Sequence, residues 1–202
     1  MEDKMRFALT CFVTALAGLT PALAFDKSVS DVLQRMKIGK ALPIGEVATL
    51  MKESERWCYN QEGEGCAWSD IYLDVTDTGA TFEIGNAWDD EVNVYFTDQG
   101  TFEDNRFICE STIDWLPTLR AARRDDGMPI GGRELWAIRS QMSGNTGPTD
   151  CFDYVLKSSD EAAETITLLQ RKWTDGATDE AQDATVTIHF DPASAAALTW
   201  YF

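Results

Sequence analysis

Basic residues are scarce in this chain of 202 residues, and acidic residues outnumber them. Lysine and arginine together number 17, whereas aspartate and glutamate number 34, which gives a formal net charge of −17. Nucleic acids and anionic lipid headgroups attract basic surfaces, so this balance disfavours both as partners. We therefore expect no nucleic-acid partner, whereas a cationic partner is compatible with the charge.

Histidine is almost absent, which narrows the catalytic classes that the chain can contain. His189 is the single histidine, and no Gly-x-Ser-x-Gly turn is present to hold a nucleophilic serine. His189 alternates with Val186 and Ile188 in a strand-like run, so it shares a face with Thr185 and Thr187. We predict a surface-facing strand histidine without a catalytic role.

Acidic residues are so abundant that they do not single out a catalytic pair. Two suitably placed carboxylates are enough for glycoside hydrolysis. However, Asp89-Asp90-Glu91, Glu103-Asp104 and Asp160-Glu161 all fall at predicted turns, where solvated acids are the default. No catalytic residue is therefore assigned. The cysteine spacing fits no zinc finger or ribbon, and the acids of residues 175–183 lack the spacing of the standard calcium loop, so we expect no metal and no other cofactor.

Long apolar runs are missing except at the front of the chain. Arg6, the apolar residues after it and the small residues of Ala22-Leu23-Ala24 are typical of a signal peptide over residues 1–24. The residues before Met5 are net acidic, so either Met1 or Met5 starts the protein. An uncleaved anchor is the alternative, because the apolar stretch approaches the ~18 residues of a membrane span. No later segment is long and apolar enough, so we expect no stable membrane insertion after cleavage.

Cysteine is sparse, and its distribution agrees with export. Cys11 lies in the predicted signal peptide, which leaves Cys58, Cys66, Cys109 and Cys151. An even number of cysteines in an exported chain predicts disulfides, and four cysteines allow three pairings. A short loop brings its own ends together most readily, so we favour Cys58 with Cys66. Cys109 and Cys151 would then join two strands that are distant in the sequence.

Residues 25–57 form the predicted N-terminal helical segment, which contains two helices. Ser28-Val29-Ser30-Asp31 has the form of a helix-capping box. Apolar residues then recur at helical spacing until Gly39, a natural stop. A second apolar stripe begins after Pro43 and ends near Trp57. Each helix has one apolar face, which must pack on another element.

Apolar and polar residues alternate from Asp70 onward, which predicts β-strands with one wet face. Ile71, Leu73 and Val75 form the apolar set of the first strand and alternate with Asp70. Residues 113–126 are interpreted as a short helix that starts near Pro117. Further strands are expected at residues 82–84, 92–96, 106–111, 134–141, 151–157, 165–173, 185–190 and 198–202.

These patterns predict an α+β fold with two disulfides. Two N-terminal helices and a short central helix pack on an antiparallel β-sheet or sandwich of about eight or nine short strands. Residues 58–202 form the disulfide-linked, β-rich domain, and residues 25–57 belong to the same globular unit. The mature chain is long enough to bury a core of its own.

Two groups of side chains are candidates for binding. Trp57 and Trp68 flank Cys58 and Cys66 symmetrically, either as a core cluster packed on the disulfide or as an aromatic platform for a sugar ring or a partner's apolar anchor. The second group is a stretch of arginines: six arginines and no lysine occupy residues 106–139, and the binding candidates among them are Arg120, Arg123, Arg124 and Arg133. Arginine can bind a partner's carboxylates in a bidentate manner. Pairing with the protein's own acids is the alternative explanation of this stretch.

The sequence favours an exported soluble binding protein without catalytic activity, located in the periplasm or secreted. Its expected partner is a basic envelope protein or a glycan. The alternative is a carboxylate-dependent hydrolase acting on glycans, which needs two acids about 5–10 Å apart in an accessible cleft. A structural component of the envelope is the third hypothesis, and it would show a large exposed apolar patch.

Overall fold

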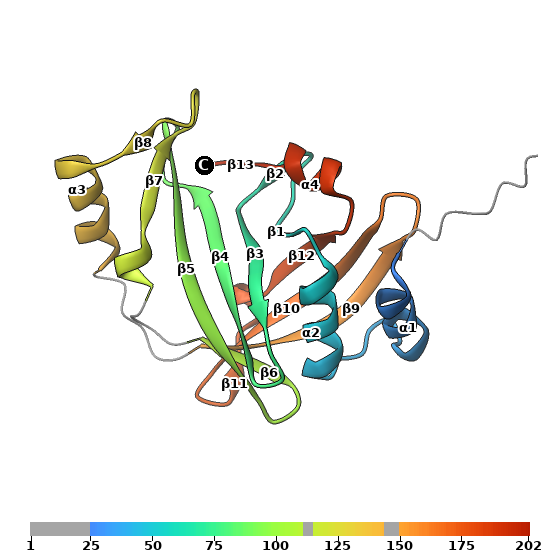
Figure 1. Cartoon of the computed structure of the whole chain (residues 1–202). Helices are drawn as coiled ribbons and strands as arrows, with labels where there is room; N and C mark the ends of the chain where they lie inside the picture. Colours follow the sequence, from blue (N-terminus) through green and yellow to red (C-terminus); the bar gives the residue numbers. More distant parts are fainter. Residues whose placement is uncertain (1–24, 111–114, 144–149) are drawn as a thin grey trace, which may run out of the picture.

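The computed structural model describes residues 25–110, 115–143 and 150–202 (Figure 1). The predicted signal peptide, residues 1–24, and the choice between Met1 and Met5 lie outside these residues. Within the described part of the chain, no helix is long and apolar enough to cross a membrane.

Eight antiparallel strands form a sheet that closes on itself. Around the ring the order is β4-β3-β1-β12-β10-β9-β6-β5, and β5 pairs with β4 to complete it. The predicted antiparallel sheet is thus confirmed, and its closed form replaces the expected sheet or sandwich. The eight strands are β1 (Arg56–Tyr59), β3 (Trp68–Val75), β4 (Gly79–Ala87), β5 (Val92–Glu103), β6 (Phe107–Glu110), β9 (Cys151–Asp160), β10 (Thr165–Thr174) and β12 (Ala184–His189).

Five short strands and several helices are attached to this ring. The hairpin of β7 (Arg120–Arg123) and β8 (Pro129–Ile130) extends the sheet from the first half of β5. The strand β13 (Thr199–Trp200) runs parallel to β2 (Gly65–Cys66), and β11 (Ala177–Thr178) pairs with the end of β10. The helices are α1 (Lys27–Arg35), α2 (Ile44–Glu53), α3 (Gly132–Met142) and α4 (Pro192–Ala197), with 3-10 turns η1 (Leu116–Thr118) and η2 (Glu180–Gln182).

The main core lies between the inner face of the ring and the two N-terminal helices. In β12, Val186 and Ile188 are fully buried, and they pack in one cluster with Val47 and Leu50 of α2. The segment between α1 and α2 is tied to β9, because the Leu42 amide donates to the Tyr154 carbonyl at 2.8 Å. The predicted pair of amphipathic helices is therefore confirmed, and the closed sheet is the surface on which it packs.

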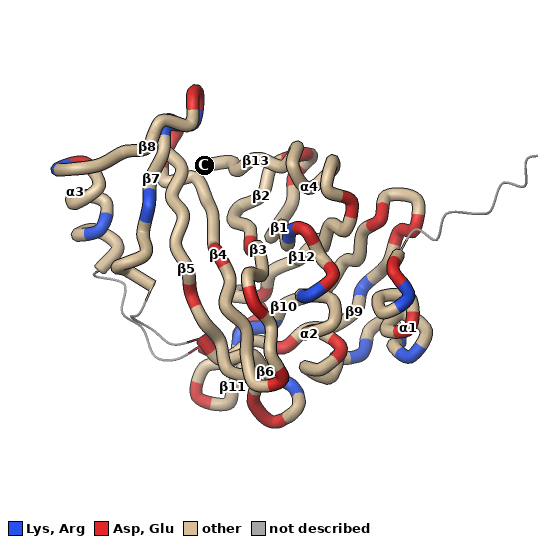
Figure 2. Tube along the Cα trace, in the orientation of Figure 1, with Lys and Arg blue, Asp and Glu red and all other residues tan. Residues whose placement is uncertain are grey.

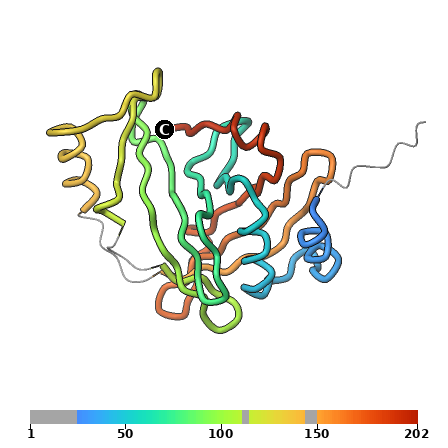
Figure 3. Tube along the Cα trace, viewed as in Figure 1, coloured from blue at the N-terminus to red at the C-terminus, as the bar shows by residue number. Residues whose placement is uncertain are grey.

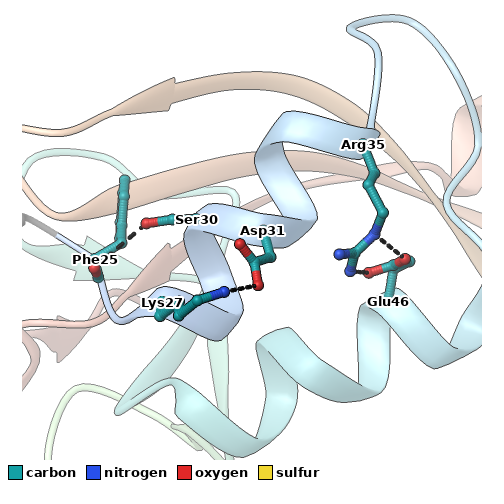
Figure 4. A network of polar contacts seen from close by, with 6 residues as sticks. All are labelled: Phe25, Lys27, Ser30, Asp31, Arg35 and Glu46. Carbon is teal, nitrogen blue, oxygen red and sulfur yellow. Dashed lines mark hydrogen bonds and ion pairs between the residues drawn. The ribbon is translucent and has the colours of Figure 1, made fainter.

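Polar contacts between α1 and α2 lie on the surface (Figure 4). Arg35 donates two hydrogen bonds to the Glu46 carboxylate, at 2.9 and 2.6 Å. Such exposed pairs contribute about 0–1 kcal/mol, so apolar packing does most to hold the helices. The predicted capping box is wrong: α1 begins at Lys27, and Asp31 pairs with Lys27 at 2.6 Å instead of capping the helix.

The first part of β3 has the opposite phase from the one predicted, and a register shift between Tyr72 and Asp74 returns Val75 to the core side as predicted. Asp70 is only 5 % exposed and Tyr72 packs against the core, whereas Leu73 is 56 % exposed. The ring interior is lined by aromatic side chains, and Tyr72 contacts the rings of Trp57 and Phe82. Aromatic packing therefore decides the inward face, and Asp70 is carried inward with Tyr72.

In the central segment, the structure has a strand in a region where a helix was predicted, and a helix where a strand was predicted. Within residues 113–126, where a helix was expected, the described residues form η1 and the strand β7. Residues 134–141, expected as a strand, belong to α3, which buries Ile138 against Leu119 and Val94. The edge of β5 offers hydrogen-bonding groups to β7, and this pairing overrides the local helical preference. The second helix also ends before Trp57, which lies in β1.

The C-terminal segment covers part of the outer face of the ring, an arrangement that was not predicted. Asp191 caps the N-terminus of α4, because its carboxylate accepts a hydrogen bond from the Ser194 amide at 2.7 Å. The indole of Trp200 then lies over Gly85, where an added Cβ would come within 2.8 Å of the ring. Figure 3 shows this segment crossing toward β4 and β5. Outward-facing residues of the ring are therefore not all in contact with solvent.

Both predicted disulfides are present, Cys58–Cys66 and Cys109–Cys151. They indicate an oxidising compartment. Cys109 and Cys151 are directly opposite each other in β6 and β9, and these two strands share only two residue pairs. This disulfide therefore reinforces the shortest pairing in the ring.

Removing the Cys109–Cys151 bridge should destabilise the protein more than removing the other bridge. The first spans 42 residues and the second 8, so the chain-entropy relation gives losses of about 4 and about 2.5 kcal/mol. Urea unfolding of the Cys109→Ala/Cys151→Ala and Cys58→Ala/Cys66→Ala variants measures both losses. An equal or smaller loss for the first variant would contradict the importance of this closure.

Candidate functional site

The two candidate tryptophans point into the ring and do not form a platform around the disulfide. Trp57 is 0 % exposed, and its indole donates to the Ser54 hydroxyl at 2.8 Å. The Trp68 ring stacks on Tyr59 with centroids 4.6 Å apart. Because side chains alternate along β1, Trp57 faces inward and Cys58 faces outward. The Cys58–Cys66 bridge packs instead with Leu198 and Trp200.

The candidate arginines are divided among three places. Arg120 pairs with Glu83 on the outer face of the ring, and its guanidinium lies over the Tyr95 ring. Arg133 is exposed in the first turn of α3. Only Arg123 and Arg124 line a common hollow, so the structure does not bring the four arginines together.

This hollow has a volume of about 570 Å³. Arg123 pairs with Glu134 at 2.9 Å and with Glu91 at 3.7 Å. Arg124 donates to the backbone carbonyls of Asp89 at 3.1 Å and Trp200 at 2.5 Å. Both guanidinium groups are therefore engaged by the protein itself, whereas Asp90 and Asp125, which also line the hollow, are exposed.

We call the region around this hollow the hairpin corner: the β4–β5 turn, residues 88–91; the β7–β8 hairpin, residues 120–130; the helix α3; and residues 200–202. Figure 1 shows the C-terminus beside the ends of β4, β5 and β7, and α3 on the other side of β7. Three large apolar side chains of this corner are exposed: Met128 (59 %), Trp136 (70 %) and Phe202 (76 %).

Exposed carboxylates accompany these apolar side chains. Asp90 and Glu91 lie in the β4–β5 turn, and Asp125 and Asp126 form the tip of the β7–β8 hairpin. In Figure 2 the tip of this hairpin, the loop that protrudes beyond β7 and β8, is red because it is acidic. The hairpin corner thus combines an acidic rim, exposed apolar anchors and a hollow, which is the combination that a basic protein surface can match.

A second cluster of acids lies inside the ring and was missed by the sequence patterns. The Asp70 Oδ2 atom accepts a hydrogen bond from the Tyr59 hydroxyl at 2.6 Å, whereas Oδ1 has no hydrogen-bond partner among the described residues. Asp98 is 6 % exposed and lies on the same, inward face of β5 as Gly100 and Phe102. The signal that could have revealed the cluster is the tyrosine two residues after Asp70, which marks the inward face.

Glu110 joins this cluster from β6, where it follows inward-facing Ile108 in phase. Burial raises the pKa of Asp70 to about 7, and the charge of Asp98 adds to this effect while the Tyr59 hydrogen bond opposes it. Burial also raises the pKa of Glu110 to about 8, and the charges of Asp70, Asp98 and Asp150 add to it. These acids can therefore exchange protons near neutral pH, which is unusual for carboxyl groups.

His189 does not face solvent, contrary to the prediction. It shares the outer face with Thr187 as expected, but it is only 6 % exposed because α4 packs on β12. Its Nε2 lies 3.0 Å from the Gln61 Oε1 atom. Burial, followed by the charge of Arg56, lowers the pKa of His189. No serine or cysteine nucleophile is hydrogen-bonded to it among the contacts of the described residues.

One group of potential metal ligands occurs among the described residues, Glu103 with Cys109 and Cys151, whose ligand atoms lie within 4.8 Å of one another. Both cysteine sulfurs form the disulfide, so they do not offer thiolates to a metal ion. The smaller depression, of about 340 Å³, lies on the outer face beside Glu103 and has four threonines in its lining: Thr76, Thr78, Thr81 and Thr101.

Comparison with known proteins gives no family assignment. The sequence matches no protein-family model, and no curated protein is significantly similar to it. Function must therefore be inferred from the geometry of the hairpin corner and of the interior acids.

The interior acids predict that the protein loses stability as the pH rises. The pKa of Asp70 is about 7 in the folded protein and about 4 in an unfolded chain, so its protonated form favours folding. This contribution is complete below about pH 4 and is lost as the pH rises through about 7. The free energy of unfolding, measured in urea at pH 5, 7 and 9, should fall over this range.

The variant Asp70→Asn separates this effect from the general repulsion of an acidic protein. Asparagine does not ionise, so the variant should lose less stability between pH 5 and 9 than the wild type does. Glu103→Gln, which changes an exposed acid, should follow the wild-type curve. Parallel curves for Asp70→Asn and the wild type would show that Asp70 does not titrate in this range.

Proposed function

We propose that the protein is an exported binding protein without catalytic activity that recognises a basic envelope protein through the hairpin corner. The predicted signal peptide and the two disulfides support export to the periplasm or the exterior. The observation that carries the proposal is the exposure of three large apolar side chains, Met128, Trp136 and Phe202, on the elements of the hairpin corner. The same corner contains a hollow of about 570 Å³ that is lined by Asp90, Glu91 and Asp125 together with two arginines.

The charge of the corner favours a basic partner. The rim acids Asp90, Glu91, Asp125 and Asp126 are exposed, whereas the arginines of the hollow are held by Glu91, Glu134 and backbone carbonyls. A net charge of −17 on the whole chain also accelerates the approach of a basic protein. An anionic ligand would have to displace these acids from the arginines and would meet repulsion from the rim.

The apolar side chains favour a protein over a glycan. Tryptophan and methionine are enriched where proteins bind proteins, and a few such residues usually supply most of the affinity. A glycan platform would need accessible aromatic rings arranged together, but Trp57 is completely buried and the Trp68 ring is covered by Tyr59. The hollow is of the size that receives one or two large side chains of a partner.

The interior acids do not favour the alternative of a glycan hydrolase. The raised pKa values of Asp70 and Glu110 would suit proton transfer, but Asp70 and its neighbour Asp98 are only 5 % and 6 % exposed. A glycan chain needs both carboxyl groups at its scissile bond, and it does not reach groups that are buried inside the ring. Binding at the hairpin corner therefore agrees better with the accessibility of the side chains.

The proposal predicts that changes at the hairpin corner weaken binding to a basic partner. The partner is first captured from envelope extract with the oxidised protein, then purified and titrated calorimetrically. Trp136→Ala should weaken binding about 10-fold or more if Trp136 is an anchor. Asp125→Asn/Asp126→Asn should weaken it several-fold, and this loss should shrink at high salt because ions screen exposed charges.

The matched control is Asp77→Asn/Glu161→Gln, which removes two exposed acids from other turns. This control should bind like the wild type if the corner is the contact. Equal weakening by the control and by Asp125→Asn/Asp126→Asn would mean that overall charge attracts the partner, and it would reject the corner as a specific site. A captured partner that is acidic would also reject the proposal.

A further inference from the structure

We propose that the reduced form of the protein binds a zinc ion between Cys109, Cys151 and Glu103. In the oxidised form the two sulfurs are joined in the disulfide and offer no thiolates. Reduction therefore exchanges a covalent link between β6 and β9 for a metal link between the same strands. The site shares no residue with the hairpin corner, and zinc binding there is independent of the proposed function.

Three adjacent strands bring the ligands to one face of the sheet. Cys109 on β6 lies directly opposite Thr101 on β5 and directly opposite Cys151 on β9. Glu103 lies two residues beyond Thr101, so it shares the same face and is diagonal to Cys109, within reach of a long side chain. A carboxylate oxygen of Glu103 and the two sulfur atoms accordingly lie within 4.8 Å of one another.

These separations suit a tetrahedral zinc site. With Zn–S bonds of about 2.3 Å and Zn–O bonds of about 2.0–2.2 Å, the ligand atoms of such a site lie about 3.5–3.8 Å from one another. Breaking the S–S bond lets the two sulfurs move apart to non-bonded contact, so rotations of three side chains are enough to reach this geometry. Thiolates are soft ligands, and two of them favour zinc over calcium or magnesium.

The site is open to solvent and its carboxylate is restrained. The surface depression of about 340 Å³ is lined by Thr101, Glu103 and Cys109, so an ion can enter and a water molecule can fill the fourth position. The Thr101 hydroxyl donates a hydrogen bond to the Glu103 Oε1 atom at 3.3 Å. Hydrogen bonds of this kind orient metal ligands and raise the affinity for the ion.

This disulfide is the more accessible of the two. Cys151 is partly exposed, whereas Cys58 and Cys66 are both 0 % exposed. The chain also passes through a form with free thiols before its disulfides are made, because thiols are kept reduced in the cytosol.

The reductant that opens the formed bridge is a dithiol. One of its thiolates attacks the Cys151 sulfur, the S–S bond breaks, and Cys109 leaves as a thiolate that takes up a proton. The second thiol of the reductant then displaces Cys151 from the mixed disulfide. The dithiol, oxidised by two electrons, departs as a disulfide, and two thiols remain on the protein. Each thiol gives up its proton when it binds zinc, so the uptake of one ion releases two protons.

The test is a metal titration of the protein reduced with a phosphine, which contains no thiol to compete for the ion. Cadmium reports thiolate ligands by its charge-transfer absorption, and zinc is then titrated in competition. We expect one ion per chain, the release of two protons, and a Kd of about 10 µM or lower. The oxidised protein should give no charge-transfer band. No saturable binding by the reduced protein at up to about 100 µM metal would overturn the inference.

Variants locate the ion. Glu103→Gln should weaken zinc binding at least about 10-fold, because a neutral amide replaces a charged ligand. The matched control is Glu64→Gln, which changes an exposed acid two residues from Cys66, and it should bind like the wild type. Cys58→Ala/Cys66→Ala should also retain the site. Loss of zinc in this last variant, or equal affinities of Glu103→Gln and the wild type, would reject the assignment.

A measurement of the metal's ligands covers the case in which the reduced chain unfolds without metal. X-ray absorption of the zinc-bound protein should show two sulfur ligands, with oxygen in the remaining positions, and circular dichroism should show the β-sheet of the oxidised protein. Four sulfur ligands, or zinc held by a chain without the sheet, would contradict a site built on the closed ring. Asp125→Asn/Asp126→Asn should leave zinc binding unchanged, so the two proposals are tested by separate residues.

Discussion

The closure of the sheet between β6 and β9 is the constraint on which the interior of the molecule depends. These strands share two residue pairs, and Cys109–Cys151 joins one of them covalently. Beyond these pairs, the edge of β9 is bonded by the segment between α1 and α2, whose Leu42 and Gly39 amides donate to carbonyls of β9. Asp70 and Glu110 sit on strands of the same ring, so their raised pKa values are a consequence of this closure. Without it, the same carboxyl groups would be hydrated and would ionise as ordinary acids.

The closed ring and the hairpin corner are structurally distinct parts of the molecule. The first half of β5 pairs with β7 and the second half with β6, while β4 pairs along its whole length. The β7–β8 hairpin and α3 are therefore attached to the ring without contributing to its closure. Their small core of Leu119, Ala121, Ile130 and Ile138 is separate from the main core. Exposed residues of this appendage can serve recognition while the ring maintains the fold.

The sequence predicted those features that follow from short-range patterns or from chain closure. Helical spacing identified the two N-terminal helices, and loop length identified the disulfide partners. The inward face of β3 was not predictable by alternation alone, because Leu73 and Tyr72 are both compatible with burial and only the aromatic lining of the ring decides between them. His189 was misjudged because alternation does not reveal what covers the outer face of β12, which includes Gln61, 128 residues earlier in the chain. Trp57 and Trp68 were expected either as a core cluster packed on the disulfide or as an aromatic platform, and alternation about Cys58 instead directs them into the main core. The hairpin corner joins segments more than a hundred residues apart in the chain.

The same long-range assembly explains why an acidic protein keeps acids inside. Exposed carboxylates at the hairpin corner cost nothing in desolvation, whereas Asp70 and Glu110 must bind protons or a cation to remain buried near neutral pH. Leucine at these positions would remove that cost and would pack against the surrounding rings. Tyr59, which donates to Asp70 at 2.6 Å, would then lose its acceptor. A buried polar network that is only partly satisfied costs free energy, and the Oδ1 atom of Asp70 is the point at which hydrogen bonding among the described residues is incomplete.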